Sequence, residues 1–158
     1  MQSYAKDLIE ISYTMMQNMK KYAPERTIIG NKLGITRVQI MTLRFVSYNN
    51  ECKTSDIAEF LLVSRSDATR IVDTLVHKGF IDRVYDKNDR RVIRLKITTE
   101  GKRVFEDIKK ELITNFSEII IKMEKEDSEA LMRGMKALCD VLKETDQEKD
   151  EIKSGEGE

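Results

Sequence analysis

Two short amphipathic segments that meet across a turn of about three residues constrain the fold of this 158-residue chain more than any other feature. The second segment, residues 65–78, follows a serine suited to an N-cap, Ser64, and ends before Gly79, which suits a left-handed helix end. The first segment, residues 55–62, opens at Thr54. Two helices joined in this way form a helix-turn-helix. The apolar residues expected to face inward are Ile57, Ala58, Leu61, Ala68, Ile71, Val72 and Leu75.

A charged hairpin is predicted directly after the second helix. Residues 80–85 favour a strand, and residues 92–98 alternate apolar residues with Arg94 and Lys96. The joining residues 86–91, DKNDRR, have the aspartate and asparagine content of a turn and carry two acids and three bases. A two-stranded finger beside a helix-turn-helix is able to reach a minor groove, where a narrow A·T-rich segment attracts an inserted arginine.

The polar face of residues 65–78 is a candidate DNA-reading surface. Its outward residues are Arg65, Ser66, Thr69, Arg70 and Asp73. The first three lie near the N-terminal end, which is the end that a recognition helix inserts in the major groove. A solvated polar face would have the same composition, so this helix alone leaves both interpretations open.

The charge distribution also bears on nucleic-acid binding. The formal net charge is zero, with 28 basic and 28 acidic residues. Residues 53–103 nevertheless hold 12 basic and 8 acidic residues, whereas residues 124–158 hold 6 basic and 12 acidic ones. Because phosphate attraction is screened within about 8 Å at physiological salt, a local basic excess matters more than the distant acidic tail. An ordinary charge-rich surface is the alternative interpretation.

Four further helical segments flank this region. Residues 4–22 have helical apolar spacing and stop before Pro24, and TIIGNKLGI then predicts a glycine-punctuated loop. Thr36 and Gln39 form a capping box for a helix over 37–48. A long helix begins at Thr99-Glu100-Gly101 with a stripe that reaches Met123, and a last helix follows KEDS.

The outer helices carry apolar stripes that a small helix-turn-helix lobe cannot cover. A symmetric homodimer is the economical solution, because one patch then covers its own copy. An intrachain helical bundle is the alternative. The residues predicted to form the dimer surface are Leu8, Ile11, Met15, Leu131, Met135, Leu138 and Leu142.

Enzymatic, metal-binding and membrane functions find no support in the sequence. There is no glycine-rich phosphate loop, no nucleophile motif and no cluster of metal ligands, and His77 suits a helix C-terminus better than catalysis. We therefore expect no enzyme, no cofactor and no metal. Cys52 and Cys139 are read as structural, although the polar surroundings of Cys52 leave an oxidation sensor open. With no long apolar run and no signal peptide, we expect a cytoplasmic protein without a membrane partner.

The ordered set of motifs resembles the MarR family of bacterial and archaeal transcriptional regulators. The set comprises the run from Val63 to Arg70, Leu75 followed by Lys78-Gly79, the wing pattern Asp89-Arg90-Arg91, and the segment LKITTEG at 95–101. The similarity covers roughly residues 4–145. It departs from the family in having Ile97 where leucine often stands, and in lacking the N-terminal reactive cysteine of the family's peroxide sensors.

The resemblance implies a homodimer with recognition helices in successive major grooves and wings in flanking minor grooves. It implies that Arg91 is the minor-groove arginine, that Asp89 buttresses it, and that Arg90 contacts phosphate. The DNA-binding residues expected on this basis are Ser64, Arg65, Ser66, Thr69, Arg70, Lys87, Asp89, Arg90 and Arg91. A small aromatic or phenolic effector is implied between the dimer helices and the DNA-binding lobe. That region would include Arg44, but methionine and tyrosine at helical spacing are ordinarily core, so no effector-binding residue is assigned.

The expected fold is mostly α with a small β-wing, a winged helix-turn-helix flanked by N- and C-terminal dimerisation helices. Its expected parts are an N-terminal helix and loop over 1–35, a DNA-binding lobe over 36–101, C-terminal helices over 102–146 and a flexible acidic tail over 147–158. The expected function is a DNA-binding transcriptional regulator that acts on a pseudo-palindromic operator, a repressor relieved by an effector. A winged-helix adaptor that binds protein rather than specific DNA is the alternative.

Overall fold

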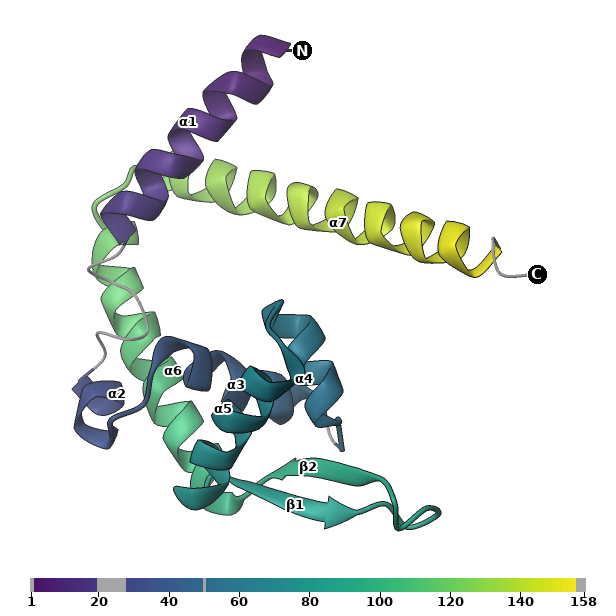
Figure 1. The fold of residues 1–158 in the computed structure, drawn as a ribbon. Coiled ribbons are helices and arrows are strands. Elements are labelled where there is room, and N and C mark those ends of the chain that lie inside the picture. Colours follow the sequence, from purple (N-terminus) through teal and green to yellow (C-terminus); the bar gives the residue numbers. More distant parts are fainter. Residues whose placement is uncertain (1, 20–27, 50, 156–158) are drawn as a thin grey trace. The chain divides into compact units, whose positions relative to one another are not determined.

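Helices and one hairpin account for the fold of the residues that the structure describes, which are 2–19, 28–49 and 51–155 in a computed structural model (Figure 1). The elements are α1 (Gln2–Met19), α2 (Ile28–Leu33), α3 (Arg37–Tyr48), α4 (Thr54–Leu61), α5 (Arg65–His77), β1 (Ile81–Tyr85), β2 (Ile93–Ile97), α6 (Thr99–Ile120) and α7 (Lys125–Gly155). They divide into two units, Met1–Asn115 and Phe116–Glu158. The predicted fold class, mostly α with a two-stranded wing, is confirmed.

The hydrophobic core of the first unit lies where α3, α4, α5, the hairpin and the start of α6 meet. Its fully buried side chains include Leu43 from α3, Ile57 from α4, Leu75 from α5, Leu95 from β2 and Ile108 from α6. Most of the residues predicted to face inward on α4 and α5 are buried in this core, and Leu61 and Ile71 are part-buried. This shared core holds the helix-turn-helix and the root of the wing in one lobe.

Local caps set the ends of the lobe's helices. The Thr36 hydroxyl accepts the Gln39 N–H at 3.4 Å, and the Gln39 side chain accepts the Thr36 N–H at 2.9 Å, so the predicted capping box before α3 is confirmed. Ser64 caps α5 by accepting the Asp67 N–H at 3.1 Å. Gly79 follows α5 with a φ of +73°, the left-handed conformation expected there.

The wing is an antiparallel hairpin whose register runs from Ile81 opposite Ile97 to Tyr85 opposite Ile93. Its buried face is anchored at the root rather than along its whole length, since Leu95 is fully buried whereas Ile93 is 44% exposed. The Thr98 hydroxyl donates to the Gly79 carbonyl at 2.7 Å and accepts the Gly101 N–H at 2.9 Å, which joins the end of the wing to the start of α6.

Gly101 is required by close packing at this junction. A Cβ atom at this position would lie 2.0 Å from the carbonyl oxygen of Phe80, which is backbone and cannot move aside. Glycine alone lets α6 begin against the first residues of the wing.

The segment TIIGNKLGI is not the loop predicted from its glycines, because residues 28–33 form the short helix α2. Its first amides donate to the carboxylate of Glu111 on α6, with 3.1 Å between the Ile29 nitrogen and the carboxylate oxygen. Gly34, with a φ of +59°, then ends the helix. The predicted helix end at 20–22 and Pro24 lie outside the described residues.

Cys52 is buried, with 7% of its surface exposed, which agrees with its structural interpretation and not with the alternative of an exposed oxidation sensor. Its backbone forms an isolated bridge with Leu95, whose N–H donates to the Cys52 carbonyl at 2.7 Å. Burial, together with the nearby carboxylate of Asp56, raises the pKa of the thiol to about 11. The reactive thiolate is scarce at neutral pH, which argues against the oxidation-sensor interpretation of this residue.

The second unit contains the end of α6 and the long helix α7. Met123 lies in the turn between the two helices rather than on the α6 stripe, and α7 begins at Lys125, before the expected start. The helix continues to Gly155, through residues that were expected to form a flexible tail. Among the described residues, no helix is long and apolar enough to cross a membrane.

Candidate nucleic-acid interface

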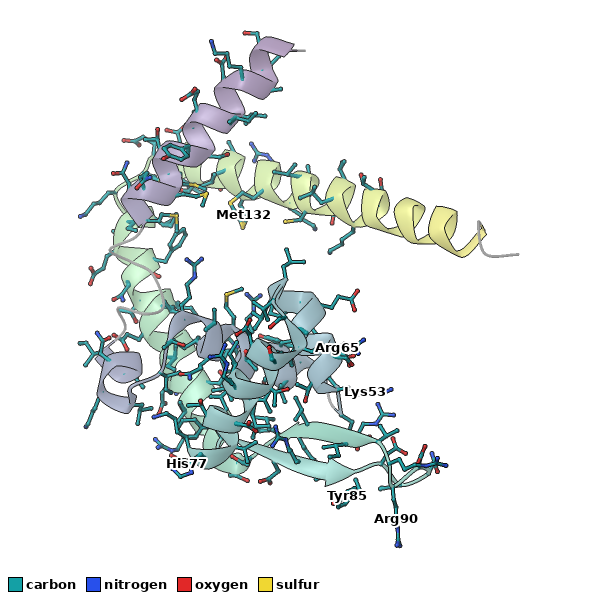
Figure 2. The ribbon with its side chains drawn as sticks, viewed as in Figure 1. Lys53, Arg65, His77, Tyr85, Arg90 and Met132 are labelled. Carbon is teal, nitrogen blue, oxygen red and sulfur yellow. The ribbon has the colours of Figure 1, made fainter. Side chains whose placement is uncertain are left out.

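The polar residues predicted on the recognition helix lie on an exposed face of α5. Ser64, Arg65, Ser66, Thr69 and Arg70 are all exposed, and Figure 2 shows Arg65 at the outer edge of the lobe. The inward residues Ala68, Val72 and Leu75 are buried on the opposite side, as the spacing requires. The structure therefore brings the predicted recognition residues together on one surface.

Hydrogen bonds within α5 organise this face. The Thr69 hydroxyl donates to the Arg65 carbonyl at 2.8 Å, which leaves its oxygen lone pairs free to accept. Asp67, which the sequence reasoning did not single out, forms a hydrogen bond with Ser64 and an ion pair with Arg70. These two contacts, the Ser64 hydroxyl first, lower the pKa of the Asp67 carboxyl. Arg70 remains 78% exposed despite its partner.

The wing tip presents its basic residues to solvent. Lys87, Arg90 and Arg91 are exposed, and Figure 2 shows Arg90 extending away from the hairpin. The Asp89 carboxylate accepts the Arg91 N–H at 2.9 Å and lies 3.5 Å from the Arg91 Nε. The predicted contact between Asp89 and Arg91 is thus present, and 95% of the Arg91 side chain is open to a partner.

Two ion pairs of the wing were not predicted. Arg83 on β1 lies 2.6 Å from Asp73 on α5, which ties the wing to the recognition helix. Arg94 on β2 lies 2.6 Å from Asp86, whereas the alternation of the strand predicted only that Arg94 and Lys96 share the face opposite the apolar residues. The segment DKNDRRVIR begins with Asp86 and ends with Arg94, and these opposite charges could have predicted the second pair.

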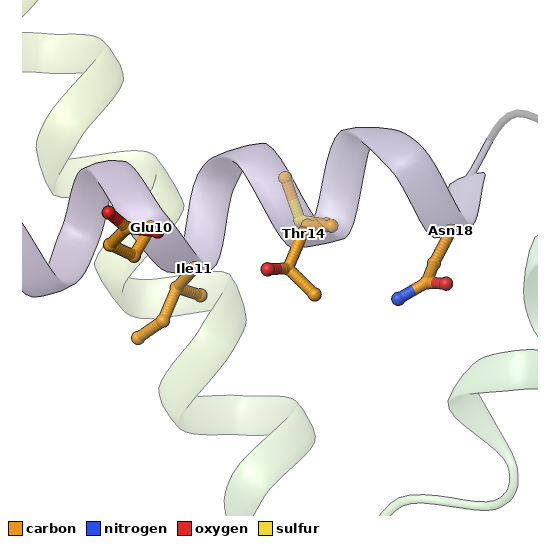
Figure 3. Close-up of a pocket in the computed structure, with 5 residues that line it drawn as sticks. Glu10, Ile11, Thr14 and Asn18 are labelled. Carbon is orange, nitrogen blue, oxygen red and sulfur yellow. The ribbon is translucent and has the colours of Figure 1, made fainter.

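The residues predicted to form a dimer surface are exposed in the single chain. On α1, Leu8 is 62% and Ile11 64% exposed, and on α7, Leu138 is 59% exposed. Met15, Leu131, Met135 and Leu142 are also exposed. Figure 3 shows a pocket on α1, where Ile11 lies beside the polar residues Glu10, Thr14 and Asn18.

The predicted effector region between the dimer helices and the DNA-binding lobe stays a prediction. The pocket on α1 is lined by α1 residues only. Arg44 lies 5.9 Å from the ring centre of Tyr48, and the Tyr48 ring packs edge-on against Phe105. An apolar pocket of about 390 Å³ occurs in the second unit. It is lined by Phe116, Ile120, Lys125, Ser128, Glu129, Leu131, Met132 and Met135.

Comparison with known proteins agrees with this geometry. The model of the MarR family matches residues 35–93. The HTH-type transcriptional repressor MdtR of Bacillus subtilis (strain 168) is 33% identical over 99 residues, which are 63% of this chain and 64% of that protein. The HTH-type transcriptional regulator YpoP of the same organism is 38% identical over 72 residues, 46% of this chain and 51% of that protein. The matched segments thus span less than two thirds of these two relatives.

A solved structure of a MarR family protein from Bacillus stearothermophilus shares the fold with a TM-score of 0.78 at 17% identity, covering 90% of this chain and 98% of that one. The fold and the arrangement of α4, α5 and the hairpin define a winged helix-turn-helix protein. The match of the MarR family model to residues 35–93 bears out the resemblance inferred from the sequence. Members of this family are transcriptional regulators and not enzymes.

Proposed function

We propose that this protein is a sequence-specific DNA-binding transcriptional regulator that acts as a homodimer on a pseudo-palindromic operator. The observation that carries the proposal is the position of two exposed elements on one lobe, a polar helix face and a basic wing tip. The polar face of α5 lies beside a wing with an arginine tip, and the pair between Arg83 and Asp73 links the two. A recognition helix and a wing held in fixed relation suit a major groove and the minor groove next to it.

Each element would make a different kind of contact. Arg65, Ser66 and Thr69 present a guanidinium and two hydroxyl groups, the groups that read guanine edges and bind phosphate. Arg91 would enter the minor groove with Asp89 as its buttress, while Lys87 and Arg90 would contact phosphate. The remaining α5 contacts are proposed for Ser64 and Arg70.

The homodimer is supported by the exposed apolar stripes of α1 and α7. Both α1 and α7 expose large apolar side chains, and a soluble monomer rarely leaves stripes of this kind open to solvent. In a two-fold dimer the same patches cover each other, and two recognition helices then face successive major grooves.

Repression relieved by a small aromatic or phenolic effector is proposed on the strength of the family resemblance. An effector of this kind would favour a dimer whose recognition helices no longer match the operator spacing, and would lower the affinity for DNA. Because a protein that acts on an operator lies in the same compartment as the DNA, the proposal also implies a cytoplasmic protein.

Selection of binding sites from random duplex DNA, repeated at two salt concentrations, tests the function. We expect enrichment of a two-fold pseudo-palindrome with half-sites about one helical turn apart, and an affinity that falls as salt rises. A protein that enriches no sequence and binds independently of salt would instead be the protein-binding adaptor.

A further inference from the structure

The tip of the wing is tied to the lobe through Arg94. Its Nε donates to an Asp86 carboxylate oxygen at 2.6 Å, and its Nη1 donates to the Glu51 carbonyl at 3.0 Å. Glu51 lies between α3 and α4, 43 residues away in the sequence, and has a φ of +66°, which residues other than glycine rarely adopt. The guanidinium thus bridges the wing and the loop before α4.

Asp86 organises the other side of this bridge. Its second carboxylate oxygen accepts the N–H groups of Asn88 and Asp89, at 2.8 Å and 3.3 Å. Its own N–H donates to the Val92 carbonyl at 2.9 Å, which closes the loop of the hairpin. The Asp86 side chain is only 14% exposed, although it lies at the base of a loop that is otherwise open to solvent.

The loop so closed is the one that carries Arg91. The Asp89 N–H donates to the Asp86 carboxylate, and the Asp89 carboxylate in turn accepts the Arg91 N–H. The chain of contacts therefore runs from the Glu51 carbonyl through Arg94, Asp86 and Asp89 to Arg91. A two-stranded hairpin has little stability of its own in water, so its distal end depends on contacts of this kind.

We propose that the Asp86–Arg94 pair is a positioning element that holds the wing tip, and with it Arg91, in the conformation that enters the minor groove. The inference rests on the proposed DNA-binding function and adds two residues to it, neither of which needs to touch DNA. A tip ordered before binding loses less conformational entropy when the complex forms. Arginine suits the role because its planar fork supplies two donors to two acceptors at once, which lysine cannot reproduce.

Replacing Asp86 separates this role from a general effect of charge. Asp86→Asn removes a negative charge from a DNA-facing element, and phosphate attraction alone would then strengthen binding. Loss of the positioning element predicts the opposite sign, because the tip becomes mobile. Asp82→Asn is the matched control, since Asp82 is exposed on the same hairpin, carries the same charge and makes none of these hydrogen bonds.

The experiment measures the affinity of the full-length protein for its selected operator by fluorescence anisotropy. We expect Asp86→Asn and Arg94→Lys each to weaken binding by roughly 5- to 10-fold, and Asp82→Asn to leave it equal or slightly tighter. In an Arg91→Ala background, Asp86→Asn should produce no further loss, because the element acts through Arg91. A full additional loss in that background would overturn the proposal.

Amide hydrogen exchange in the absence of DNA provides a second readout. The N–H groups of Asn88 and Asp89 should exchange faster in Asp86→Asn and Arg94→Lys, whereas amides of the α5 core remain protected. Unchanged exchange at the tip, or affinity equal to that of Asp82→Asn while Arg91→Ala weakens binding, would overturn the positioning role. If the wild-type protein selects no operator, the proposed function fails instead, and exchange still reports on the pair.

Discussion

At the scale of single residues, carboxylates on the interface are held ionised by specific donors. The backbone N–H of Asn88, the largest contribution, and the guanidinium of Arg94 lower the pKa of Asp86 below its ordinary value of 3.8. A carboxyl whose pKa is depressed in the folded state stabilises the fold above its unfolded pKa, and this contribution is lost as the pH falls through the folded pKa. The contribution of Asp86 to the free energy of unfolding is therefore complete at neutral pH and is lost in acid.

This linkage predicts how Asp86→Asn depends on pH. The wild-type protein should have the larger free energy of unfolding at pH 6, and the difference should shrink below about pH 3.8 as the wild-type carboxyl is protonated. Urea unfolding of both proteins between pH 6 and pH 3, at about unit intervals, measures the difference. A difference that stays constant over this range would show that the charge of Asp86 contributes nothing.

At the scale of elements, the N-terminus of α5 combines a structural cap with the proposed DNA contacts. The Ser64 hydroxyl accepts the Asp67 N–H, so Ser64→Ala should lower the free energy of unfolding by about 0.5–2 kcal/mol. Ser66→Ala, two residues further on and also exposed, should change it by less than about 0.5 kcal/mol. Chemical denaturation of the two variants makes the comparison, and equal losses would contradict the capping role.

The elements whose limits were predicted correctly are those fixed by neighbours in the sequence. The capping box at Thr36, the cap at Ser64 and the left-handed Gly79 act within a few residues, so the pattern of the chain contains them. The failures have distant causes. The first turn of α2 is hydrogen-bonded to Glu111, 82 residues from Ile29, and no feature of the local sequence predicts that contact.

The same distinction separates the predicted and unpredicted parts of the candidate site. Asp89 and Arg91 are two residues apart, and their contact was expected from that spacing. Arg94 reaches Glu51 and buried Cys52 pairs with Leu95, and both contacts require the loop before α4 to lie along β2. Alternation within a strand reports which face a side chain occupies but not which remote segment covers that face.

At the scale of the whole molecule, the exposed stripes of α1 and α7 lead to a prediction about assembly. Leu138→Glu places a charge in the middle of the α7 stripe, where Leu138 is 59% exposed in the single chain. We expect the wild-type protein to sediment as a dimer and this variant as a monomer, because burying an unpaired carboxylate in an apolar interface is unfavourable. Analytical ultracentrifugation at several protein concentrations measures the change.

Tyr85→Glu is the control for this experiment. Tyr85 lies on the wing, outside the proposed dimer surface, and is 70% exposed. The substitution introduces the same charge at an exposed position outside the α7 stripe, and it should leave the dimer intact. A dimer that survives Leu138→Glu would place the interface elsewhere.

The contrast between the two cysteines has a practical consequence. Cys52 is buried with its pKa raised to about 11, whereas Cys139 is exposed on α7. A maleimide dye near neutral pH should consequently couple to Cys139 alone, because it reacts with the accessible thiolate. The native sequence thus offers one labelling position per subunit. Mixing donor- and acceptor-labelled protein would then allow energy transfer to follow subunit exchange without engineering a cysteine.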